Sequence, residues 1–133
     1  MRNHPYLRAY MAGVLLPTWV LPVLLAGFLA AKARGHVPAG LDAAIIFPMA
    51  IVPNLWGIWN VLYMALGLRQ RVSIAVFGSL LPLLLVPAGM VLAAAFGLHF
   101  YGWPGPLLLP AAMAVYYLAW RYIVSFLNRV AGL

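Results

Sequence analysis

Long apolar runs follow one another along the chain with only short polar connections between them, a pattern that predicts helices crossing a membrane. Each run reaches the roughly 20 residues that a helix needs to cross about 30 Å of hydrocarbon. The first run also exceeds the roughly 7–15 apolar residues of a signal peptide, so we interpret it as a membrane span. The predicted transmembrane helices cover about 10–31, 43–68, 74–98 and 105–127.

The connections between these spans are short, so consecutive helices are expected to be antiparallel neighbours. No long linker or low-complexity segment interrupts the pattern. The sequence therefore predicts a single domain over residues 1–133, an all-α membrane protein with four transmembrane helices in an antiparallel bundle.

A short motif recurs at an offset of 65 residues, linking the first predicted span to the third. Trp59 and Trp120 would link the second span to the fourth in the same way. One interpretation is a tandem duplication of a two-helix hairpin; the alternative is coincidence, because leucine matches are common in apolar sequences. The motif consists of Gly13, Pro17 and Pro22 in one copy and of Gly78, Pro82 and Pro87 in the other.

Basic residues lie at the ends of the apolar runs and are unevenly divided between the two sides of the predicted bundle. Six fall on the side of both termini, whereas only Lys32 and Arg34 fall in the first connection. The positive-inside rule then predicts an integral protein of a bacterial-type inner or plasma membrane with cytoplasmic N- and C-termini. The net charge of +7 does not indicate nucleic acid as a partner, because the basic residues form no patch with interleaved aromatics.

The side chains that most catalytic mechanisms require are nearly absent. Asp42 is the only acidic residue, there is no cysteine, and the three histidines lie in the tail and connections without metal-ligand spacing. We therefore predict no cofactor, no metal site and no enzyme activity, because the serines lack a histidine or carboxylate partner at similar depth.

The second span carries the densest polar segment of the sequence. Five of its residues recur at helical spacing and share one face: Pro53, Trp56, Asn60, Tyr63 and Gly67. Amides in hydrocarbon usually find partners on neighbouring helices, so one interpretation is interhelical hydrogen bonding and the other is a pocket for an amphipathic molecule. The candidate ligand-binding residues of this span are Asn54, Trp56, Trp59, Asn60 and Tyr63.

The fourth span carries a matching stripe of polar residues at positions i, i+4, i+8 and i+11, namely Tyr117, Arg121, Ser125 and Asn128. An arginine within the hydrocarbon needs a partner or water. Because the expected topology puts Asp42 on the other side, Arg121 must use backbone carbonyls, extend to the headgroups, or bind an external anion. Our hypothesis is that Arg121 binds a lipid phosphate or the head of an anionic ligand, with Asn60 and Tyr63 beside it.

These observations predict a small polytopic protein that binds or transports a small amphipathic or anionic molecule, including lipid, between the second and fourth helices. The alternative is a non-catalytic accessory or assembly subunit of a larger membrane complex. Both interpretations imply the lipid bilayer as a partner, together with self-association into a homo-oligomer or contact with other membrane subunits, because one protomer has little room for a central path.

Overall fold

The computed structural model describes residues 4–36, 42–95 and 108–133, and it places side chains outside 42–50, 92, 93 and 108. In those ranges the regular structure is helical without any strand, which confirms the all-α fold class. The elements are α1 (Pro5–Ala33), α2 (Asp42–Ala65), the short helix η1 (Leu68–Gln70), α3 (Ile74–Ser79), α4 (Leu81–Ala95), α5 (Leu108–Ala119), the π-helical segment η2 (Trp120–Val124) and α6 (Ser125–Val130).

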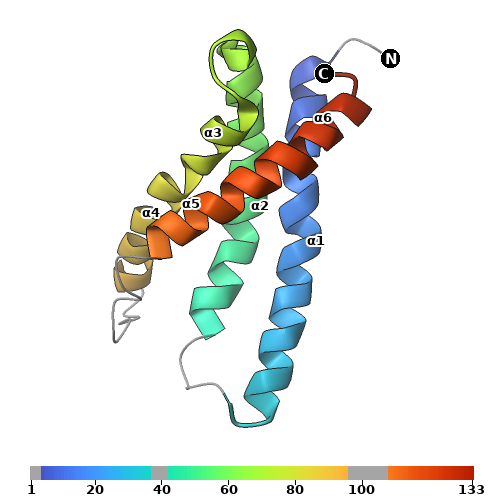
Figure 1. The fold of residues 1–133 in the computed structure, drawn as a ribbon. Helices are drawn as coiled ribbons and strands as arrows, with labels where there is room; N and C mark the ends of the chain where they lie inside the picture. Colours follow the sequence, from blue (N-terminus) through green and yellow to red (C-terminus); the bar gives the residue numbers. More distant parts are fainter. Residues whose placement is uncertain (1–3, 37–41, 96–107) are drawn as a thin grey trace.

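α1 and α2 form an antiparallel pair, the α5–α6 rod runs obliquely across this pair, and α3 and α4 lie to one side of it (Figure 1). α1 and α2 lie side by side, and the chain turns back through η1 into α3 and α4, which act as one bent helix. α5, η2 and α6 form a continuous rod that runs obliquely from α4 to α1. Two stretches, Pro5–Ala33 and Ile74–Val91, are long and apolar enough to cross a membrane, which supports membrane association.

The predicted span 74–98 contains a bend between α3 and α4, at Leu80. Pro82 has no N–H and cannot donate to the carbonyl four residues earlier, so the regular helical ladder is interrupted here. The turn tightens instead, and the Leu83 N–H donates to the Leu80 carbonyl at 3.1 Å. The bend directs α4 away from α2 (Figure 1).

Glycine allows α1 and α2 to approach until their backbones touch. A Cβ atom on Gly13 would lie 2.6 Å from the Trp56 carbonyl oxygen and 2.8 Å from Gly57 Cα. A Cβ on Gly57 would in turn lie 2.6 Å from the ring of Tyr10. These contacts fix the register of α1 against α2.

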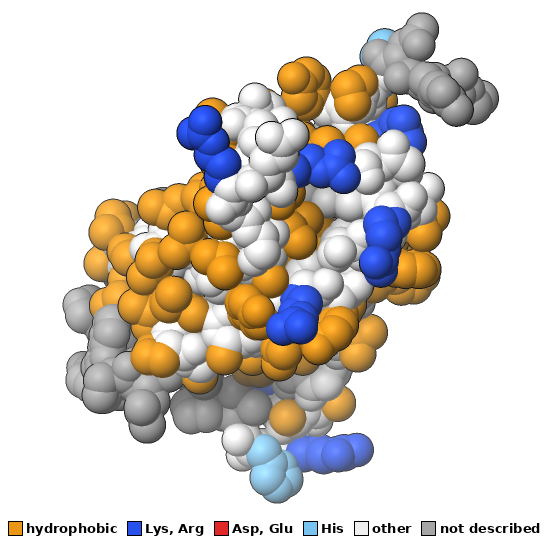
Figure 2. Space-filling model, turned by 45° about the horizontal axis from the view of Figure 1, so that its top comes forward, with side chains coloured by type: hydrophobic (Ala, Val, Ile, Leu, Met, Phe, Trp, Pro, Cys, Tyr) orange, Lys and Arg blue, Asp and Glu red, His pale blue; other side chains and the backbone are white. Residues whose placement is uncertain are grey.

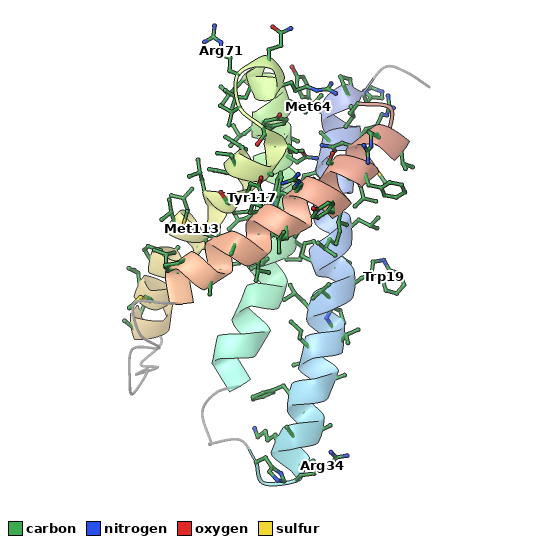
Figure 3. The ribbon with its side chains drawn as sticks, in the orientation of Figure 1. Trp19, Arg34, Met64, Arg71, Met113 and Tyr117 are labelled. Atoms are coloured by element: carbon green, nitrogen blue, oxygen red, sulfur yellow. The ribbon has the colours of Figure 1, made fainter. Side chains whose placement is uncertain are left out.

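The buried core lies toward one end of the molecule. Its centre is a cluster of Trp56, Leu81, Trp120 and Val124. α1 contributes buried residues only as far along the helix as Pro17, and Trp19 is already 71% exposed and points away from the other helices (Figure 3). The remaining half of α1 therefore presents apolar side chains outward.

Basic side chains gather at the end of the molecule that holds the core. This arginine-rich end, formed by Arg8, Arg69, Arg71 and Arg129, lies where α1 begins, where the η1 turn sits and where α6 ends (Figure 1). Figure 2 shows blue side chains spread over this part of the surface. Arg34 lies at the opposite end (Figure 3). The predicted division of charge between the two ends is thus present in the described residues.

Candidate functional site

The helix formed by α5, η2 and α6 carries two parallel rows of residues spaced by four. At about 3.6 residues per turn, such a row would drift roughly 40° around an α-helix at each step. The wider π turn of η2 counteracts this drift. The inner row packs on the core and consists of Tyr116, Trp120, Val124 and Asn128. The neighbouring row, which we call the polar row, consists of Tyr117, Arg121, Ser125 and Arg129.

Trp120 sets the rotation of this helix. Its side chain is fully buried against Gly78, where a Cβ atom would lie only 2.0 Å from Trp120 Cγ. Its ring also meets the ring of Trp56, with centroids 5.4 Å apart. With Trp120 held in this position, the next residue, Arg121, faces outward and is exposed.

A buried amide junction joins α1, α2 and α6. Asn60 is fully buried and donates through Nδ2 to the Ala9 carbonyl at 2.7 Å and to Asn128 Oδ1 at 2.8 Å. Asn128 Nδ2 donates back to Asn60 Oδ1 at 3.0 Å. The amide of Asn60 is therefore occupied by the protein itself, as the interhelical interpretation of the sequence predicts.

Arg121 lies outside this junction, among aromatic side chains. Its Nη1 donates to the Tyr117 hydroxyl at 3.2 Å. The guanidinium carbon lies 5.9 Å from the centroid of the Tyr117 ring and 5.5 Å from that of Tyr122. Tyr117 is on α5 and Tyr122 is on η2, so the guanidinium lies between two tyrosine rings from consecutive turns of this helix.

The other predicted site residues on α2 have separate partners. Trp59 Nε1 donates to the Phe77 carbonyl at 2.8 Å, and the two rings stack with centroids 4.7 Å apart. The Tyr63 hydroxyl donates to the Val72 carbonyl at 2.9 Å.

Asn54 lies on a different side of α2 from these residues. It is exposed, and its Oδ1 accepts a hydrogen bond from the Tyr10 hydroxyl on α1.

The predicted site residues thus fall into two groups. Trp56, Asn60 and Tyr63 are buried together on α2, whereas Gly67, predicted on the same face, lies beyond the end of this helix in a left-handed conformation. Tyr117 and Arg121 meet on the outer surface, with the half-buried Ser125 following in the same row. The structure brings Asn60 against Asn128 and does not place it against Arg121. The prediction that Asn128 shares a stripe with Arg121 is wrong, because the π turn of η2 lies between them and Asn128 is buried while Arg121 is exposed.

Sequence reasoning did not include Tyr122 and Trp120 among the site residues, although both shape the surroundings of Arg121. A usable signal was present in the sequence, because Trp120 directly precedes an arginine that cannot be buried without a counterion. The larger apolar neighbour is then the residue expected to face the core.

The described side chains offer no acidic partner to Arg121, and they contain no group of three metal-ligating residues. The groups present at this position are a guanidinium and a hydroxyl, both of which can donate hydrogen bonds to an anion.

Comparison of the chain with protein-family models, with curated proteins and with solved structures gives no significant match.

Proposed function

We propose that this chain is an integral membrane protein that binds an anionic amphipathic ligand, of the phospholipid class, through Arg121. In this proposal four helices span the bilayer and the arginine-rich end faces the cytoplasm, in accordance with the positive-inside rule. The observation that carries the proposal is the outward guanidinium of Arg121, held by Tyr117 and flanked by the exposed hydrophobic side chains of Leu118 and Tyr122.

The depth of Arg121 strengthens this proposal. Arg129 is eight residues further along the helix, which corresponds to about 12 Å along the axis. If Arg129 marks the membrane interface, Arg121 lies well within the hydrocarbon. A charge in that position is costly unless an anion or water accompanies it.

The buried residues have a supporting role in this proposal. Two contacts fix the rotation of the fourth helix: the hydrogen bond between Asn60 and Asn128, and the packing of Trp120 against Gly78. In this rotation Arg121 faces outward. In this interpretation the second helix positions the site and the fourth helix supplies the binding groups. Binding requires no catalytic step.

Native mass spectrometry of the detergent-released protein with added phosphatidylglycerol or phosphatidylcholine tests the proposal. We expect phosphatidylglycerol to remain bound to the wild-type protein, and Arg121→Gln to lose it. Arg71→Gln, which removes an exposed charge in the turn after η1, is the matched control and should retain it. Equal retention of phosphatidylglycerol by Arg121→Gln and wild type would overturn the proposal.

A second candidate function is that of an accessory subunit in a larger membrane complex. It is favoured by the part of α1 that follows Pro17, where Trp19, Val23 and Leu24 are 71%, 69% and 59% exposed. Co-release of a fixed partner polypeptide from the native membrane, unaffected by Arg121→Gln, would support this function in place of lipid binding.

A further inference from the structure

We infer that the polar row is a lateral entry path, along which the headgroup of an anionic phospholipid passes from the membrane interface to Arg121. This inference rests on the proposed function and adds to it the direction from which the ligand arrives and the residues that it meets first. The path consists of Arg129, Ser125, Arg121 and Tyr117, in that order from the arginine-rich end.

The row offers polar groups at regular steps along the helix. Steps of four residues correspond to about 6 Å along the axis. Arg129 and Arg121 are exposed, and Ser125 between them is half-buried. A headgroup that leaves Arg129 therefore meets a hydroxyl and then a second guanidinium before it must enter purely apolar surroundings.

Apolar side chains border the row on its outward side. Tyr122, Phe126 and Val130, each one residue further on than a member of the row, are 61%, 54% and 70% exposed. Such a border keeps acyl chains in contact with apolar surface while the phosphate follows the polar groups. An apolar surface beside a row of polar groups matches a phospholipid, which has both acyl chains and a charged headgroup, better than it matches a fully hydrated ion.

Charge along the row selects for an anion. Both charged members are arginines, whose planar guanidinium groups match phosphate oxygens well. The row contains no acidic residue, and the described side chains contain none elsewhere. The last member, Tyr117, is already engaged with Arg121, so the row ends at a site with both a cation and a hydroxyl.

The natural absence of cysteine allows a direct test with single-cysteine variants. Ser125→Cys places a thiol inside the row, and Ile123→Cys, at a position that is 40% exposed, places one at similar depth on the far side of the helix. The measurement is the rate of modification by the anionic sulfonatoethyl methanethiosulfonate, divided by the rate with its cationic trimethylammonium counterpart.

We expect the Ser125→Cys protein to prefer the anionic reagent by on the order of tenfold over the Ile123→Cys protein. Either Arg121→Gln or Arg129→Gln, added to Ser125→Cys, should reduce this preference. Phosphatidylglycerol should slow modification of Ser125→Cys, and phosphatidylcholine should not. Arg129→Gln should weaken this protection without abolishing it, because Arg121 remains to hold the headgroup.

The inference and the proposed function fail in different ways. If Ser125→Cys shows neither anion preference nor protection, while Arg121→Gln still loses phosphatidylglycerol in native mass spectrometry, the entry path is wrong and the binding site stands. If Arg121→Gln retains phosphatidylglycerol, the proposed function itself is wrong. Protection by inorganic phosphate equal to that by phosphatidylglycerol would show a free anion as the ligand and overturn the lipid path.

Discussion

Asn60 and Asn128 face each other as a reciprocal amide pair, in which each side chain donates to and accepts from the other at 2.8 and 3.0 Å. The pair is buried and bridges α2 and α6, and Asn60 adds a third bond to Ala9 of α1. One point in the core therefore sets the positions of three helices.

Replacing either asparagine by leucine should lower the free energy of unfolding by about 1–2 kcal/mol, because the remaining amide is left buried without its partner. The double variant should lose less than the sum, with a coupling energy of about 0.5–1.5 kcal/mol. Unfolding in mixed micelles measures both quantities. Asn54→Leu removes an exposed amide from the same helix and should cost less. Additive losses would contradict direct coupling of the pair.

Gly78→Ala should destabilise the protein by about 1–3 kcal/mol, since the new methyl group overlaps a tightly packed ring. The neighbour that must move is Trp120, which is fully buried. Gly89→Ala is a matched control in the same bent helix, because a Cβ there has no atom within 4 Å. The control should be unchanged or more stable by up to about 1 kcal/mol. Thermal unfolding in detergent compares the two, and equal stabilities would argue against the Trp120 contact.

Tyr117→Phe should weaken the binding of phosphatidylglycerol by about two- to tenfold, the effect of one lost hydrogen bond. The hydroxyl removed is the one that holds Arg121 at 3.2 Å, while the ring remains. Tyr122→Phe also keeps its ring beside the guanidinium and should change affinity less than about twofold. Lipid titration by native mass spectrometry gives both affinities. Equal losses in the two variants would show that the Tyr117 hydroxyl has no special part.

Trp59→Phe should cost about 1 kcal/mol of unfolding free energy, because it removes the indole donor to the Phe77 carbonyl. Part of the stacking against the Phe77 ring should survive, which limits the loss. Trp19→Phe changes an exposed indole and should be close to neutral. Chemical unfolding followed by far-ultraviolet circular dichroism distinguishes the two outcomes. A larger loss from Trp19→Phe would indicate that the surface of α1 is covered by another chain.

The sequence predicted the helical segments well because long apolar runs can satisfy their backbone only as helices in hydrocarbon. It also predicted the buried face of α2, since Trp56, Asn60 and Tyr63 recur at helical spacing. The observed ends differ by a few residues: α1 begins at Pro5, whose fixed φ suits the first turn, rather than near residue 10.

The pairing of the second and fourth helices was harder to predict. Asn60 was expected beside Arg121, yet its partner in the structure is Asn128. The reason is the π turn, which keeps residues spaced by four in register and brings the row containing Trp120 onto the core. Neither the π turn nor the space left by Gly78 for an indole ring follows from hydrophobic spacing alone.

In both halves of the proposed duplication, the glycine of the repeated motif contacts a tryptophan. Gly13 lies against the backbone of Trp56, and Gly78 lies against the ring of Trp120. The two tryptophans also contact each other. The sequence had instead linked Trp59 with Trp120, because spacing alone does not show which tryptophan meets the glycine. Whether the halves share an origin stays a prediction.

The amide junction can be completed only late in the synthesis of the protein. Its hydrogen bonds join positions separated by 51 and 68 residues, so during synthesis α1 and α2 emerge long before α6. Until then Asn60 has the Ala9 carbonyl as a partner but lacks Asn128, and a polar amide in the early hairpin stays incompletely satisfied. We therefore expect the hairpin of α1 and α2 to be less stable before α6 is made than in the finished protein, because the Asn60 amide then lacks one of its partners.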